Sequence, residues 1–236
     1  MLGGRIDILS RRELLRGIEG RIRQGRFTQI LSVNPLMLEA ASQDPALAEI
    51  FSQAHFCAPE SAGMAIIAHL KGIPIQETIP GIELMADLCA MAEKNGWPVC
   101  FVGGKPGVGE KTVQELRKRY PGLIVAGVFH GYLSDDEERH SLGTIKKSNP
   151  KLIFAALGVP RQEKWIFQNR KILEGAAALG VGGSFDVISG NLRRSPLWLR
   201  RVGLEWLFRC LQEPWRFRRA ALTARAVFLA ISRPIS

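Results

Sequence analysis

Two carboxylates stand where they could act on a bound ligand. Glu60 follows the apolar segment 55–58 after one proline. There it could serve as a general base, or it could simply be an acid at the start of a helix, where the helix dipole favours negative charge. Asp186 lies in an otherwise apolar, glycine-rich segment, 182–190. Because an isolated carboxylate in such surroundings usually has a buried partner or a ligand, Asp186 is a candidate binding residue.

A glycine pair could approach a phosphate. Gly103 and Gly104 follow the apolar segment 98–102, and their backbone N–H groups could hold a diphosphate. The sequence lacks a P-loop, because Glu110 stands where the phosphate-binding lysine belongs. It also lacks a dinucleotide fingerprint, because Thr112 replaces the third glycine. A purely structural turn is the alternative.

Neither a metal nor a cofactor is predicted. The four histidines show no HxH or HxxxH spacing, and no DxD-type pair follows a strand. The four cysteines show no CxxC spacing, and three lie in apolar segments. We therefore expect buried, unpaired thiols in a reducing compartment.

Apolar segments alternate with helical ones through the first 190 residues. Strands are expected at 6–9, 29–33, 55–58, 98–102, 123–128, 152–157 and 176–181. Helices are expected at 11–24, 35–42, 45–53, 62–71, 82–95, 108–119, 134–147 and 162–170. This alternation is typical of an α/β fold, a Rossmann-like parallel sheet sandwiched by helices. We assign residues 1–190 to this body and residues 191–236 to a helical appendage.

Ligands of open parallel sheets bind beyond the carboxyl ends of the strands. The expected strand ends bring five segments to one edge of the sheet: Asn34, Glu60, Gly103–Gly104, Gly158–Glu163 and Gly182–Asp186. One crevice built from these loops is predicted.

Most of the net charge of +10 lies in residues 191–236, which hold ten arginines and two acidic residues. Such charge fits nucleic acid, anionic lipid or phosphate-bearing small molecules. The arginines alternate with Trp198, Trp206 and Trp215. This pattern fits an interfacial element on an anionic membrane, and equally an ordinary packing helix with solvated arginines. With neither a signal peptide nor a spanning segment, we expect a cytoplasmic protein attached peripherally to the inner face of the membrane.

Several motifs occur together, in this order: Ser32-Val-Asn34, Pro59-Glu60, Ile79-Pro-Gly81, Phe101-Val-Gly-Gly104, Gly158-x-Pro-x-Gln-Glu163, Gly183-Ser-Phe-Asp-Val-Ile-Ser-Gly190, Leu204-Glu-Trp206 and Glu213-Pro-x-Arg216. They cover nearly the whole chain, which resembles the WecG/TagA/CpsF family of bacterial glycosyltransferases. The resemblance implies a metal-independent, inverting transferase without a cofactor. It would move N-acetylmannosamine from a UDP-sugar to a polyprenyl-diphosphate-linked N-acetylglucosamine, a step in teichoic acid or related surface-polymer synthesis.

The resemblance also implies roles for single residues. Glu60 stands where the family has its proposed base, usually an aspartate. The residues expected to bind the donor or the acceptor are Ser32, Asn34, Thr78, Gly103, Gly104, Gln162, Asp186, Arg209, Arg216 and Arg219. Ser32 replaces a usual threonine and keeps the hydroxyl, whereas Thr78 replaces a usual arginine and loses its charge. These departures do not change the expected reaction class, but they leave the identity of the donor sugar undetermined.

The sequence leaves alternative functions. The same fold could use a different UDP-hexose donor in exopolysaccharide synthesis. The basic tail alone would fit a nucleic-acid binder, but the body carries only +2 and has no such motif, so no nucleic-acid partner is expected. A nicotinamide-dependent oxidoreductase lacks its glycine fingerprint. Homo-oligomer formation is left open.

Overall fold

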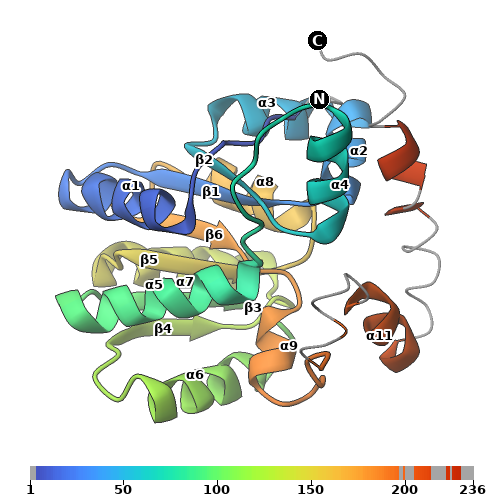
Figure 1. Cartoon of the computed structure of the whole chain (residues 1–236). Helices are drawn as coiled ribbons and strands as arrows, with labels where there is room; N and C mark the ends of the chain where they lie inside the picture. Colours follow the sequence, from blue (N-terminus) through green and yellow to red (C-terminus); the bar gives the residue numbers. More distant parts are fainter. Residues whose placement is uncertain (1–3, 197–198, 200–204, 214–221, 224, 230–236) are drawn as a thin grey trace.

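The computed structural model describes residues 4–196, 199, 205–213, 222–223 and 225–229, and structural statements here refer to these residues. A six-stranded sheet with the order β2-β1-β6-β5-β3-β4 forms the centre of the molecule (Figure 1). All five strand pairs are parallel. The strands are β1 (Thr28–Val33), β2 (Phe56–Pro59), β3 (Val99–Gly103), β4 (Val125–Phe129), β5 (Leu152–Ala156) and β6 (Ala177–Gly180). The predicted Rossmann-like α/β fold is confirmed.

The prediction of a strand at residues 6–9 is wrong. Residues 6–9 run beside β2 without forming a strand. The Asp7 N–H donates to the Cys57 carbonyl at 2.9 Å, but the Cys57 N–H donates back to the Asp7 carboxylate at 2.8 Å. Because a side chain takes the place of the backbone acceptor, no ladder continues from this pair.

Two of the helices begin with a capping box. Ser10 and Ser134 each form a capping box with a glutamate three residues on, at the starts of α1 (Arg11–Arg23) and α7 (Asp135–Ser148). The other helices are α2 (Pro35–Gln43), α3 (Pro45–Gln53), α4 (Ala62–Leu70), α5 (Gly81–Asn95), α6 (Val108–Arg119), α8 (Arg161–Gln168), α9 (Ser184–Ile188) and α11 (Glu205–Gln212). Helix α9 was not expected, because its glycine-rich sequence favours a loop.

Helices cover both faces of the sheet. On one face Phe101 and Phe154 pack with α1, α5 and α6. The opposite face packs on α2, α3 and α4 at the β1–β2 end and on α7 and α8 at the other. Strand β3 leads through α6 to β4, whereas β5 leads through α8 back to β6. The strand order therefore reverses between β3 and β5, and ligands of open parallel sheets bind beyond the carboxyl ends of the strands at such a reversal.

Parts of the C-terminal segment contact this body. Ala226 and Cys210 are buried, and Val227 packs against the cluster formed by α2, α3 and α4. Within the described part of the chain, no helix is both long and apolar enough to cross a membrane.

Candidate active site

Glu60 is held at the carboxyl end of β2 by two neighbouring elements. Its N–H donates to the Val33 carbonyl of β1 at 2.8 Å. Its carboxylate accepts one hydrogen bond from Asn34 Nδ2 at 3.2 Å and one from the Gly81 N–H at 3.3 Å. The side chain is half-buried, so it is positioned and remains within reach of solvent. This placement is compatible with a general base, and the catalytic role of Glu60 stays a prediction.

Asn34 has two structural tasks. As the N-cap of α2, its Oδ1 accepts from the Met37 N–H at 3.1 Å. Its Nδ2 then faces Glu60, so the amide orientation is fixed by a backbone donor on one side and a carboxylate on the other. Asn34 is thus both a helix cap and a partner of Glu60, and its predicted contact with a sugar stays a prediction.

Ser32 lies on β1 beside the same carboxylate. It is buried, and its Oγ has no hydrogen-bond partner within the described residues. A Cβ at Gly81 would lie 3.1 Å from Ser32 Oγ and 3.2 Å from Glu60 Oε1. The glycine therefore allows the start of α5 to approach both groups. An unpartnered buried hydroxyl is costly, and a ligand that hydrogen-bonds to it would relieve that cost.

Thr78 belongs to the segment that leads into α5. It is half-buried, and the next residue, Ile79, donates its N–H to the Pro59 carbonyl at 2.7 Å. The segment therefore runs beside Glu60, as its expected role requires.

Gln162 and Glu163 form a buried polar pair at the start of α8, with 3% and 1% exposure. Gln162 Oε1 accepts from the Gly182 N–H at 3.0 Å, and its Nε2 donates to Glu163 Oε1 at 2.7 Å. Burial raises the pKa of Glu163 to about 7, and the charge of Glu60 contributes in the same direction. The sequence predicts Gln162 as a binding residue, whereas Glu163 was not among the predicted site residues. The signal that could have found it is a glutamate directly after that glutamine in a strand-end motif.

The glycine pair at the end of β3 is required by close backbone packing. Gly103 and Gly104 have φ angles of 115° and 73°, and a Cβ at Gly103 would lie 2.4 Å from the Ala156 carbonyl oxygen. The Gly104 N–H already donates to that oxygen at 2.9 Å. The expectation of a free amide is therefore not met at Gly104.

Asp186 lies in the first turn of α9, not in a loop. Its carbonyl accepts from the Leu192 N–H at 2.9 Å, and its side chain is half-buried. Within the described residues its carboxylate has no hydrogen-bond partner. The expected buried partner is absent there, and ligand binding by Asp186 stays a prediction.

The family follows from a comparison with known protein families. Residues 1–234 match the model described as "Glycosyl transferase WecG/TagA/CpsF family". The chain belongs to this family. A relative from Bacillus spizizenii (strain W23) is 36% identical over 196 residues, which cover 83% of this chain and 76% of that protein. It is named N-acetylglucosaminyldiphosphoundecaprenol N-acetyl-beta-D-mannosaminyltransferase.

Further relatives carry the same name. One from Bacillus subtilis (strain 168) is 34% identical over 190 residues, covering 80% of this chain and 73% of the relative. One from Staphylococcus aureus (strain MRSA252) is 33% identical over 182 residues, covering 77% and 71%. As a WecG/TagA/CpsF protein, the chain is a hexosyltransferase, and the resemblance found in its motifs is confirmed.

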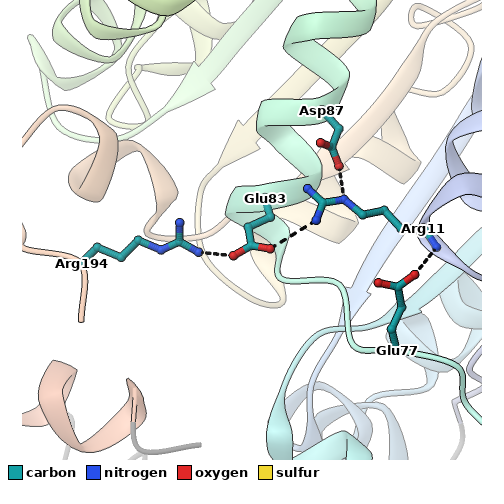
Figure 2. Close-up of polar contacts among 5 residues, drawn as sticks. All are labelled: Arg11, Glu77, Glu83, Asp87 and Arg194. Carbon is teal, nitrogen blue, oxygen red and sulfur yellow. Dashed lines mark hydrogen bonds and ion pairs between the residues drawn. The ribbon is translucent and has the colours of Figure 1, made fainter. Parts of the chain in front are cut away.

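The C-terminal segment of this WecG/TagA/CpsF chain is joined to the site by a charged network (Figure 2). Arg194 Nη2 lies 2.6 Å from Glu83 Oε1, in the first turn of α5. Glu83 Oε2 lies 3.4 Å from Arg11 Nη1, and Arg11 also contacts Asp87 and Glu77. The hydrogen bond to Asp87 raises the pKa of Arg11, which therefore stays charged. Four separate segments meet at this network.

A second contact holds α11 to the same segment. Gln212 accepts from the Arg193 N–H at 2.8 Å and donates to the Arg193 carbonyl at 2.9 Å. Arg209 lies in α11, but its side chain is outside the described part, and Arg216 and Arg219 lie outside the described residues. Their predicted roles stay predictions.

The remaining reactive groups do not form a centre. All four cysteines are buried and unpaired, as expected, and burial raises the pKa of Cys57, Cys89 and Cys100 to about 12. Among the described residues, no three histidines, cysteines or acids gather in a group that could hold a metal ion.

Proposed function

We propose that this chain transfers N-acetylmannosamine from a UDP-sugar to a polyprenyl-diphosphate-linked N-acetylglucosamine, in the synthesis of a teichoic acid-like surface polymer. The observation that carries the proposal is the held carboxylate of Glu60. It accepts from Asn34 and Gly81 and lies beside the unpartnered hydroxyl of Ser32. The shared name of the relatives supplies the donor sugar and the acceptor.

In this mechanism Glu60 takes the proton from the acceptor hydroxyl. The acceptor oxygen forms a bond to the anomeric carbon while the bond from that carbon to the UDP oxygen breaks, with inversion. Base catalysis of this kind contributes about 10²–10⁴-fold, so binding and charge stabilisation must supply the rest. We assign sugar contacts to Ser32, Asn34, Thr78, Gln162 and Asp186.

The leaving UDP carries the developing negative charge, and no resident metal or cofactor is proposed to stabilise it. Arg209, Arg216 and Arg219 are assigned to the diphosphates. The appendage of residues 191–236, with ten arginines and two acids, is proposed to hold the enzyme on the anionic inner face of the membrane.

A donor screen tests the proposal. The full chain is incubated with a short-chain analogue of polyprenyl-diphosphate N-acetylglucosamine and single UDP-hexoses, with and without excess EDTA, and products are identified by mass. We expect transfer of N-acetylhexosamine from UDP-N-acetylmannosamine, unaffected by EDTA. Transfer from another UDP-hexose alone would favour the exopolysaccharide alternative. The absence of transfer from every UDP-sugar would overturn the proposed function.

A further inference from the structure

Glu163 is a buried acid to which the mechanism above gives no task. Its Oε1 accepts from Gln162 Nε2 at 2.7 Å. Its Oε2 is buried and has no hydrogen-bond partner in the described part of the chain. A buried carboxyl with one oxygen unpaired is costly for the fold, so its presence needs a reason.

The backbone around Glu163 leaves it little freedom. A Cβ at Gly180 of β6 would lie 2.4 Å from Gln162 Nε2 and 2.8 Å from Glu163 Oε1. On the other side, Gln29 Nε2 of β1 donates to the Glu163 carbonyl at 3.0 Å. The pair is therefore enclosed by β1 and β6, and β1 is also the neighbour of β2, at whose end Glu60 stands.

This enclosure fixes the orientation of the Gln162 amide. The Gly182 N–H can only donate, so the atom that faces it must be the amide oxygen. The amide nitrogen then faces Glu163 and uses one of its two N–H groups there. The second N–H is left for another acceptor, such as a sugar oxygen.

Burial favours the protonated form of Glu163. Two nearby carboxylates have partners of their own: Asp44, the N-cap of α3, pairs with Lys164 at 2.6 Å, and Glu138 of α7 accepts a hydrogen bond from Trp165 at 2.7 Å. Burial raises the pKa of Glu163 to about 7, and Glu60 adds to this rise. Below that pH the group carries a proton and no charge.

We propose that Glu163 is a positioning residue that works as a neutral acid: it fixes the amide of Gln162 for the sugar and leaves Glu60 as the charged carboxylate beside it. The inference rests on the proposed function. Ionised Glu163 would place a second negative charge near Glu60 and disfavour a donor that carries a diphosphate. The kcat/KM for the donor therefore falls above about pH 7.

The test compares Glu163→Gln, Glu163→Ala, Gln162→Ala and the double alanine variant between pH 6 and 8.5. Glu163→Gln keeps a neutral acceptor for Gln162, so we expect at most about a threefold loss of kcat/KM at pH 6 and no fall above pH 7. Glu163→Ala should raise the donor KM about tenfold. In the Gln162→Ala background the same change should cost less than threefold, because both act through one amide. Glu138→Gln, a carboxylate on the other side of α8, should keep the wild-type profile.

Three outcomes overturn the inference: losses for Glu163→Ala and Gln162→Ala that multiply in full, a Glu163→Gln variant as impaired as Glu163→Ala, or an alkaline fall that Glu163→Gln retains. If Glu163→Ala does not fold, the Glu163→Gln profile decides alone. A wild-type protein that uses no UDP-sugar refutes the proposed function instead. Calorimetry of UDP binding to the same variants then gives the comparison without turnover.

Discussion

Arg194 of the C-terminal segment and Glu83 of α5 form an ion pair with an N–O distance of 2.6 Å. Glu83 is two residues after Gly81, and the N–H of Gly81 donates a hydrogen bond to the carboxylate of Glu60. The side chains of Arg194 and Glu83 are both about 30% exposed. Residues far apart in the chain thus meet at one turn of α5, which contacts Glu60 on one side and the start of the appendage on the other. Docking of the appendage and placement of Glu60 share this turn.

Breaking that pair should weaken catalysis without unfolding the body. A partly exposed ion pair contributes about 1 kcal/mol, which is roughly fivefold in an equilibrium. We therefore expect Arg194→Met to lower kcat on a water-soluble acceptor by about threefold to tenfold. Lys118→Met is the control, because Lys118 and Glu115 of α6 are also 2.6 Å apart, with side chains 65% and 40% exposed. Equal kcat values in the two variants would mean that Arg194 does not influence catalysis at the site.

Glu60 gives the most direct test of the mechanism. Glu60→Gln keeps the shape of the side chain and removes the base, so kcat should fall by about two orders of magnitude or more. Binding of UDP, measured by calorimetry, should change little. A variant that keeps more than half of the wild-type kcat would remove Glu60 from the mechanism. Glu60→Asp asks separately whether the site has adapted to the longer side chain.

Asn34 allows the cap and the site to be separated. Asn34→Asp keeps a good N-cap for α2 but replaces the donor to Glu60 with a carboxylate. The unfolding temperature should therefore change by only a few degrees, while kcat falls about tenfold or more. Because the second carboxylate disfavours the ionised base, the acid limb of the kcat profile should move to higher pH. An unchanged limb would show that Asn34 acts only as a cap.

The raised pKa of Glu163 also predicts how the stability of the protein depends on pH. Its pKa rises from about 4.5 to about 7 on folding. Its contribution is therefore full below pH 4.5 and is lost as the pH rises to about 7. The glutamine of Glu163→Gln does not titrate. The unfolding temperature of this variant minus that of the wild type should therefore increase between pH 4.5 and 8. A constant difference across this range would mean that Glu163 is ionised throughout.

The sequence predicts the edge of the sheet better than the contacts made there. Asn34 and Glu60 each follow an apolar segment, and because β1 and β2 are neighbours, pairing Val33 with Pro59, the two side chains meet. Gly81 could not be foreseen as their third partner, because its approach depends on how α5 docks. Glu163 was missed because an acid in a first helical turn is usually exposed. Its burial depends on Gly180, a residue of another element.

The appendage is proposed to have two separable tasks, membrane binding and catalysis. Residues 191–236 carry a net charge of +8, and each basic residue near an anionic leaflet contributes about 1 kcal/mol before screening. Arg225 Nε lies 3.7 Å from Glu39 Oε1, and its side chain is 65% exposed, so it remains accessible to lipid. Replacing Arg225 and Arg233 with glutamine should reduce binding to anionic vesicles about tenfold or more and spare turnover of a soluble acceptor.

Removing everything after Asn191 should have a different effect. The truncated body should not bind vesicles and should be inactive even on the soluble acceptor, because Arg209, Arg216 and Arg219 leave with the tail. Truncation also uncovers the apolar surface on which Ala226 and Val227 pack, so folding of the body is checked by circular dichroism. The triple substitution of the three arginines by glutamine in the full chain covers the case in which the body does not fold. Turnover of the soluble acceptor at the full-length rate by either protein would mean that the tail is an anchor without a catalytic task.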